Sequence, residues 1–308
     1  ERAYGFCTCN RQGSWTGDCH RIVILQGSTI LKLQGADVDC GGAGVGTTES
    51  IIGQWLAEDK TRRDKLIIAT KVHEPMSDDI NDQGLSARHI QMACDASLKR
   101  LGVDHIDLYQ MHHLDRAAPW DEVWQAMETL VAQGKIIYVG SSNFAGWTVA
   151  QANEAARSRH FLGLVSEQSL YNLTERTIEL EVIPACESYG LGLLPWSPLG
   201  GGILAGVLSG GDTGRRGSAD MQRRVASLRP QLEQWEALCA DLGEQPSNVG
   251  IAWLLHQPAV TAPIVGPRTI AQLDGALHAT SIELSRDVLD RIDAIFPGPG
   301  PAPEAYAW

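Results

Sequence analysis

The sequence contains no apolar run of about 18 residues and no excess of basic residues. Without such a run it offers no candidate for a membrane-spanning helix. A net charge of −12 over 308 residues argues against binding to nucleic acid, because phosphate contacts need a basic surface. The sequence also has no basic, apolar leader, so secretion is not expected. These absences favour a cytoplasmic protein that has neither a membrane nor a nucleic acid as its partner.

Complete disulfide pairing is also excluded, because the chain has seven cysteines, an odd number. Free thiols are expected of a cytoplasmic protein. The cysteines are Cys7, Cys9, Cys19 and Cys40 near the front, and Cys94, Cys186 and Cys239 within expected helices. A zinc site from the front cysteines and His20 is an alternative, but Cys-x-Cys is not a usual zinc-binding spacing. No metal site is therefore expected.

Short apolar runs alternate with amphipathic helices from residue 47 onward. The first clear run, Leu66–Val72, is rich in β-branched residues and too short for a helix. A helix is expected over Ser86–Leu101, where Gly102 ends it. The other expected strands are Ile106–His112, Ile136–Ser142, Leu164–Ser169, Leu191–Trp196 and Ala262–Pro267. The other expected helices cover residues 47–58, 120–133, 145–158, 177–188, 226–242, 248–256, 270–279 and 285–296.

This alternation predicts an α/β fold with a parallel sheet. Six strand–helix units lie between residues 66 and 267, and the helix at 47–58 needs a strand before it. An eighth unit would close a (β/α)₈ barrel, for which the chain has a suitable length. No linker divides the chain, so one domain is expected over residues 1–308, with an atypical segment at 1–35.

A doubly wound dinucleotide-binding fold is the alternative architecture. It needs Gly-x-Gly-x-x-Gly directly after a strand, and neither Gly41–Gly46 nor Gly200–Gly206 has that spacing. The sequence also lacks the Tyr-x-x-x-Lys pair of a short-chain dehydrogenase. The barrel is therefore the favoured fold.

The apolar run of each expected strand is interrupted or followed near its end by a polar or aromatic residue. These residues are Lys71, His112, Ser142 with Asn143, Gln168, Trp196 with Ser197, and Arg268. In a (β/α)₈ barrel the catalytic residues lie at the carboxyl ends of the strands. The order of these residues on successive strands therefore indicates an active site.

Seven segments of the chain carry a more specific signal. They are GTTESIIGQWLAE, LIIATKV, IDLYQMHHLD, GKIIYVGSSNF, SEQSLYNL, LLPWSPLGGGIL and PIVGPRTIAQLDGAL. Together they resemble the aldo-keto reductase superfamily over residues 36 to 308, most closely the bacterial group that is similar to the β subunits of voltage-gated potassium channels. The resemblance implies a (β/α)₈ TIM barrel that uses NADPH to reduce a small-molecule aldehyde or ketone to an alcohol.

The same resemblance implies roles for individual residues. Lys71 matches the lysine whose ammonium lowers the pKa of the family's catalytic tyrosine. His112 matches the histidine that binds and polarises the carbonyl group, and His113 is expected to lie behind it. Arg268 matches a residue at the adenosine end, where it is expected to hold the 2′-phosphate that distinguishes NADPH from NADH.

The remaining cofactor contacts also carry over from the family. Ser142, Asn143 and Gln168 match the residues that bind the nicotinamide carboxamide. The segment Trp196–Gly201 matches the one that covers the nicotinamide and cradles the pyrophosphate through backbone N–H groups. The matching residues of that segment and of the adenosine end are Trp196, Ser197, Pro198, Leu199, Gly201, Gly266 and Gln272.

One stretch departs from the family's pattern Asp-Thr-Ala-(Asp/Glu)-x-Tyr-Gly. The sequence reads Gln34-Gly35-Ala36-Asp37-Val38-Asp39-Cys40, which places Gln34 at the catalytic aspartate and Asp39 at the catalytic tyrosine. With a reference pKa of about 3.9, Asp39 would be ionised at neutral pH and could not donate a proton. An ion pair between Asp39 and Lys71 is the expected arrangement.

Residues 1–33 also differ from the family's opening, although Arg21–Leu25 and Thr29–Leu33 are candidate strands. Three interpretations stay open. In the first, the front of the sequence carries an error such as a frameshift. In the second, the protein is a diverged reductase that uses another proton donor, such as His112 or a bound water. In the third, it is a non-catalytic NADP(H)-binding barrel that acts as a sensor or partner subunit.

Overall fold

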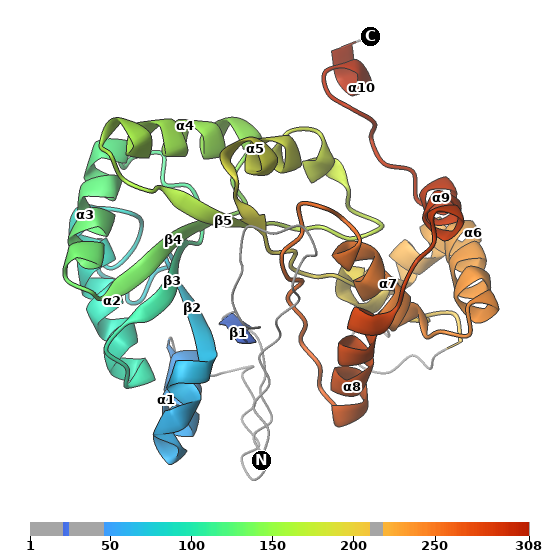
Figure 1. Cartoon of the computed structure of the whole chain (residues 1–308), viewed down its shortest axis with the longest axis horizontal. Coiled ribbons are helices and arrows are strands. Elements are labelled where there is room, and N and C mark those ends of the chain that lie inside the picture. The colour runs from blue at the N-terminus through green and yellow to red at the C-terminus, as the bar shows by residue number, and fades with distance from the viewer. Residues whose placement is uncertain (1–20, 25–45, 210–217, 308) are drawn as a thin grey trace. The chain divides into compact units, whose positions relative to one another are not determined.

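A computed structural model describes residues 21–24, 46–209 and 218–307 (Figure 1). They fall into two compact units. Unit 1 comprises residues up to Gln168 together with Ala185–Gly192, and unit 2 comprises Ser169–Pro184 and the residues from Leu193 onward. The single domain expected over 1–308 stays a prediction. Among the described residues, no helix is long and apolar enough to cross a membrane.

The sheet of unit 1 is parallel and follows chain order (Figure 1). Each strand pairs in parallel with the next one along the chain. Its strands are β1 (Arg21–Ile24), β2 (Leu66–Val72), β3 (Ile106–Met111), β4 (Ile136–Ser142) and β5 (Leu164–Gln168). This order and the intervening helices confirm the predicted α/β class, and they are the arrangement expected of a (β/α)₈ barrel.

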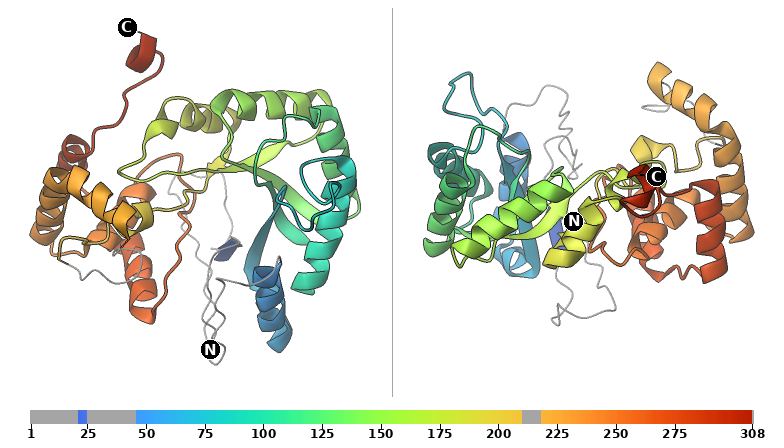
Figure 2. Two further views of the ribbon diagram at one scale, coloured as in Figure 1. Left: turned by 180° about the vertical axis from the view of Figure 1, so that it is seen from behind. Right: turned by 90° about the horizontal axis from the view of Figure 1, so that it is seen from above.

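The helices of unit 1 cover one side of this sheet (Figures 1 and 2). They are α1 (Thr47–Glu58), α2 (Ala87–Leu101), α3 (Trp120–Ala132) and α4 (Gly146–Ser158), with a 3-10 helix η1 (Lys60–Lys65) after α1. The sequence signals for α2 are confirmed, because Ser86 accepts a hydrogen bond from the His89 N–H and Gly102 ends the helix at φ 65°. Local capping therefore determines where this helix begins and ends.

Buried Glu49 ties α1 to its neighbours. Its carboxylate accepts a hydrogen bond of 2.6 Å from the Thr70 hydroxyl of β2 and one of 2.5 Å from Nε of Arg100 in α2. Only 6% of Glu49 is exposed. A buried carboxylate is stable only where such partners satisfy its oxygens, so this contact fixes α1 against the sheet.

Unit 2 is mainly helical. It contains η2 (Thr177–Glu179), η3 (Gly200–Gly202), α6 (Ala219–Asp241), α7 (Pro246–Leu255), α8 (Ile270–His278), η5 (Ala279–Ser281), α9 (Arg286–Ile295) and α10 (Glu304–Ala307). The short strand β6 (Gly192–Leu193) lies at the boundary of the units, and α5 (Val182–Tyr189) crosses it. Within unit 2, α6 and α9 lie side by side (Figure 2). Its core is formed by large side chains such as Trp235 and Trp253.

Two strand predictions for this region were wrong, because one strand is shorter than predicted and the other does not form. The strand expected over Leu191–Trp196 is reduced to β6, and the run Ala262–Pro267 forms no strand. Isolated backbone hydrogen bonds replace the expected ladder there. For example, the Ile264 N–H donates to the Pro195 oxygen at 2.8 Å. Prolines explain both cases, because Pro195, Pro263 and Pro267 have no N–H to donate to a ladder.

The packing of α1 against α2 depends on Gly53. A Cβ atom at this position would overlap the backbone oxygen of Arg100 and lie 2.9 Å from that of Leu101. Because these are backbone atoms, they cannot turn aside as a flexible side chain would. The two helices approach this closely only because residue 53 has no side chain.

We predict that Gly53→Ala lowers the free energy of unfolding by about 1–3 kcal/mol, because the overlap outweighs the better helix propensity of alanine. Chemical denaturation monitored by circular dichroism measures this change. Gly266→Ala is the matched control, because a Cβ there has no atom within 4 Å and φ is not in the left-handed region. Equal stability of the two variants would contradict the proposed close contact.

Candidate active site

The register of the strands places the predicted residue Lys71 in a row that crosses the sheet of unit 1. Lys71 lies opposite Gln110, Gln110 opposite Gly140, and Gly140 opposite Ser166. Residues that lie opposite one another in a sheet point to the same face. Thr70, the neighbour of Lys71, faces α1, so the Lys71 row points to the face away from the helices.

Three more predicted residues lie on the same face, in the row nearer the carboxyl ends of the strands. The His112 N–H donates to the Val72 oxygen at 2.9 Å and so extends the β2–β3 ladder by one residue. Ser142 lies opposite Gln168 at the ends of β4 and β5. Because side chains alternate along a strand, His112, Ser142 and Gln168 point to the same face as Lys71. The structure therefore brings these four residues together at the carboxyl ends of neighbouring strands.

Burial sets the charges of Lys71 and His112. It lowers the pKa of the Lys71 ammonium to about 8. The pKa of His112 falls to about 4, mainly because burial disfavours the charged ring, and further because of the Lys71 charge. At neutral pH, Lys71 is therefore mostly a cation and His112 is neutral.

Two polar residues of this face, Gln110 and Ser166, were missed by the sequence analysis. Gln110 is fully buried, and neither of its side-chain polar atoms has a hydrogen bond among the described residues; the same holds for the Ser166 hydroxyl. Gly140 makes room for both, since a Cβ there would lie 2.5 Å from Ser166 Oγ and 3.2 Å from Gln110 Cγ. Polar residues within otherwise apolar strands were the signal that could have identified them.

On the opposite face, Glu167 holds the turn that follows β4. It is fully buried, and it accepts a hydrogen bond from the Phe144 N–H at 3.1 Å and a short one from the Ser141 hydroxyl. In the same turn, Asn143 has φ 57° and donates its N–H to the Gln168 oxygen at 2.9 Å. Glu167, which sequence reasoning also missed, therefore positions the turn that carries Ser142 and Asn143.

The predicted pyrophosphate segment lies in unit 2. The N–H groups of its two glycines bond within the segment: Gly200 to the Ser197 oxygen at 2.9 Å and Gly201 to Ser197 Oγ at 3.1 Å. Directly after the segment, the Gly202 N–H donates to the Leu199 oxygen at 2.9 Å. The Trp196 N–H donates to the Ser169 oxygen at 3.0 Å. These bonds shape a tight turn, and its role as a phosphate cradle stays a prediction.

The predicted adenosine residues lie at the start of α8, also in unit 2. Thr269 caps this helix, because its hydroxyl accepts from the Gln272 N–H at 3.2 Å, and the Gln272 side-chain oxygen accepts in turn from the Arg268 N–H at 2.7 Å. Arg268 itself is exposed and makes no ion pair with the described residues of unit 2. An exposed guanidinium beside a helix N-terminus suits a phosphate group.

Several sequence predictions fall outside the described residues. These are the roles of Gln34 and Asp39, the Asp39–Lys71 ion pair, and the front cysteines with His20. The other three cysteines are free thiols within helices, as expected, and they are buried; burial raises the pKa of Cys94, Cys186 and Cys239 to about 12. Such thiols are poor nucleophiles and belong to the core.

Comparison with known proteins agrees with this arrangement. The model of the Aldo/keto reductase family matches residues 38–296. The chain belongs to this family. It is 50% identical over 273 residues to the uncharacterized oxidoreductase YrpG of Bacillus subtilis (strain 168), an alignment that covers 87% of this chain and 83% of that protein.

Two more distant members show the range of the family. Versiconal hemiacetal acetate reductase of Aspergillus parasiticus is 32% identical over 282 residues, with 82% of each chain covered. A probable voltage-gated potassium channel subunit beta of Arabidopsis thaliana is 30% identical over 279 residues, covering 85% of this chain and 83% of that one. The chain is therefore homologous both to oxidoreductases and to channel subunits.

We predict that Glu167→Ala lowers the free energy of unfolding by about 2–4 kcal/mol, because the Phe144 N–H and the Ser141 hydroxyl would lose a buried acceptor. Denaturant unfolding measures the loss. Glu187→Ala, at an exposed position in α5, is the control and should change stability by less than about 0.5 kcal/mol. If both variants lost the same stability, Glu167 would have no special structural role.

Proposed function

We propose that this aldo/keto reductase family member uses NADPH to reduce a small aldehyde or ketone to an alcohol. The observation that carries the proposal is the pair Lys71 and His112, which share one face and one end of the sheet and have pKa values of about 8 and about 4. Titratable neighbours whose charges differ at neutral pH are typical of acid–base sites. The reductase named among the relatives supports the same reaction class.

The residues of unit 1 fit the nicotinamide end of the cofactor. Gln168 is buried, and its side-chain oxygen has no hydrogen bond among the described residues, so it can accept from a carboxamide N–H. Ser142 and Asn143, held by the Glu167 turn, complete this set. In unit 2, Arg268 supplies a cation for the 2′-phosphate. When bound, NADPH supplies the hydride that reduces the carbonyl carbon.

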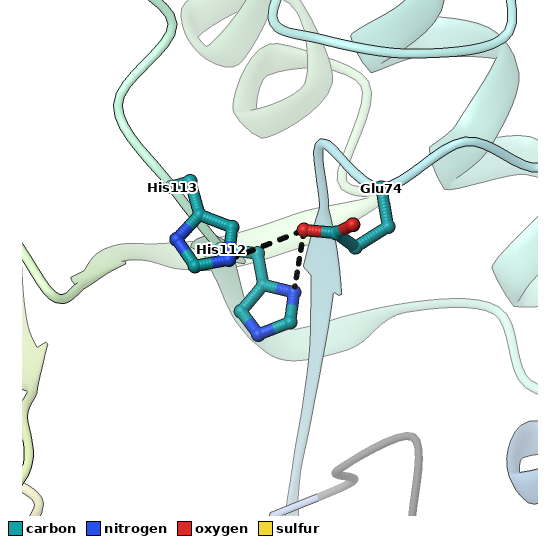
Figure 3. Close-up of side chains that lie close together, drawn as sticks. All are labelled: Glu74, His112 and His113. Carbon is teal, nitrogen blue, oxygen red and sulfur yellow. Dashed lines mark ion pairs between the residues drawn. The ribbon is translucent and has the colours of Figure 1, made fainter.

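His112 binds the carbonyl oxygen as a neutral hydrogen-bond donor. Its Nδ1 lies toward Glu74, and its other ring nitrogen, Nε2, points away from Glu74 (Figure 3). A proton on Nε2 polarises the carbonyl group and stabilises the negative charge that develops on oxygen. Because the pKa of His112 is about 4, its cationic form is scarce at neutral pH. His112 is therefore a poor candidate for the proton donor.

Lys71 is the better donor among the described residues of this face. With a pKa of about 8, its ammonium is protonated at neutral pH yet gives up a proton readily, which is the condition for general acid catalysis. The proton would pass from Nζ to the carbonyl oxygen of the substrate, which becomes the hydroxyl oxygen of the alcohol, and solvent would then return a proton to Lys71. A reductase of this kind needs no tyrosine at position 39.

A non-catalytic NADP(H)-binding protein is the second candidate. Asp39 at the place of the family's tyrosine favours it, as does the similarity to a channel β subunit. Both candidates bind NADPH, so cofactor binding cannot separate them. Turnover separates them, because only the reductase consumes NADPH when a carbonyl compound is added.

We predict that the protein oxidises NADPH in the presence of small aldehydes, and that His112→Ala lowers kcat by about 100-fold or more while NADPH binding changes little. Absorbance of NADPH measures turnover, and fluorescence titration measures binding. His160→Ala, at an exposed position outside the site, is the control. No turnover with any aldehyde would favour the non-catalytic candidate, and full activity of His112→Ala would remove its assigned role.

We also predict that activity is highest below about pH 8 and falls roughly tenfold per pH unit above it. The reason is the sign of the Lys71 shift: the ammonium is present below its pKa of about 8 and is lost as the pH rises through that value. Lys71→Arg keeps the positive charge but does not release a proton, so it should bind NADPH and turn over poorly. An active Lys71→Arg variant with an unchanged pH profile would contradict Lys71 as the donor.

A further inference from the structure

Four residues with nitrogen or oxygen ligand atoms lie just beyond β2 and β3 in unit 1. His73 and Glu74 follow β2, and His112 and His113 follow β3. Glu74 Oε1 lies 3.4 Å from His112 Nδ1 and 3.2 Å from His113 Nε2. Dashed lines mark these two contacts in Figure 3. The ladder bond from the His112 N–H to the Val72 oxygen holds the two chain segments at this separation.

These distances match those between ligands of a tetrahedral metal ion. Metal–ligand bonds of about 2.0–2.2 Å place two ligands of a tetrahedron about 3.3–3.6 Å apart. The ligand atoms of Glu74, His112 and His113 all lie within 4.8 Å of one another. Three protein ligands leave one position of the tetrahedron for a water molecule, as in open zinc sites.

The side chains have room to complete this geometry. The rings of His112 and His113 are stacked, with centroids 4.5 Å apart and planes inclined by 20°. Both side chains and that of Glu74 are partly exposed, and the terminal torsion of histidine is soft, so modest rotations can turn both nitrogens toward a common centre.

His73 adds a second observation at the same place. Its Nδ1 atom is buried, makes no hydrogen bond among the described residues, and lies 3.6 Å from Glu74 Oε1. Its ring meets that of His113 edge-on, with centroids 5.4 Å apart. His73 also has φ 133°, a conformation that costs a non-glycine residue energy and that tends to occur at functional sites.

We propose that Glu74, His112 and His113 bind a divalent transition-metal ion of the Zn²⁺ type, with His73 lining the site. Two imidazoles and one carboxylate suit Zn²⁺, Co²⁺ or Ni²⁺, whereas Mg²⁺ and Ca²⁺ prefer oxygen ligands alone. The sequence analysis expected no metal site, because it considered only the front cysteines and His20 as ligands. The proposal does not depend on the reductase activity, since ligation needs only these side chains.

Cobalt titration of the full-length protein, first stripped with a chelator, tests the site. We expect one Co²⁺ per chain with visible absorption of nitrogen and oxygen ligation and without the charge-transfer band of cysteine thiolates. His113→Ala and Glu74→Gln should each weaken binding by about 100-fold, because each removes one of three ligands. Circular dichroism of both variants verifies that they fold.

His278→Ala is the matched control, because His278 also pairs with a glutamate, Glu244, at 2.9 Å but forms no metal-like cluster with a second histidine among the described residues. This variant should bind Co²⁺ as the unmodified protein does. Zn²⁺ should also raise the thermal midpoint of the unmodified protein and of His278→Ala, but not that of His113→Ala, because an ion that binds only the folded state stabilises it. Absence of binding, a thiolate band, or unweakened binding by His113→Ala would overturn the proposal.

Discussion

The register of β2 to β5 is the constraint on which the candidate site depends. A slip of one residue in any strand would turn its inward side chains toward the helices, because side chains alternate with a period of two. Contacts on the helix side resist such a slip: Glu49 bonds to Thr70 of β2, and Glu167 bonds to Ser141 of β4. Buried polar contacts on one face therefore determine which residues the other face presents.

The same burial gives Lys71 and His112 different charges. Burial lowers the pKa of both groups, because it disfavours any cation. Their ordinary values of 10.5 and 6.5 differ so much that the shifted values, about 8 and about 4, fall on opposite sides of neutrality. One environment thus leaves Lys71 mostly charged and His112 neutral on the same face, as the proposed reduction of a carbonyl group requires.

The sequence predicts some polar residues near the ends of the strands and misses others. Position in the strand does not explain the difference, because Lys71, Gln110 and Glu167 are each the next-to-last residue of their strand. Lys71 and His112 were predicted because they match catalytic residues of the family's motifs, whereas a single polar residue such as Gln110 in a strand buried on both faces has no periodic meaning. The importance of such residues depends on neighbours more than 20 residues away, such as Gly140 for Gln110 and Ser141 for Glu167.

The helices and strands of the fold were also predicted with uneven success. Strand and helix positions through β5 follow from the pattern, because capping residues such as Ser86 and Gly102 act locally. Beyond that point the pattern fails at Pro195 and in the run Ala262–Pro267, where apolar residues indicate strands but prolines remove the N–H groups that a ladder needs. Hydrophobic periodicity predicts burial, and burial alone does not distinguish a strand from an extended segment.

The proposed carbonyl reduction and the proposed metal site both depend on which ring nitrogen of neutral His112 carries the single proton. If that proton sits on Nδ1, next to the Glu74 carboxylate, then Nε2 carries a lone pair and cannot polarise a carbonyl group. A metal ion held by Nδ1 and Glu74 would take the place of the proton there and would leave Nε2 protonated. The site at Glu74 would then determine the tautomer of His112, and with it the ability of the imidazole to act on the carbonyl oxygen.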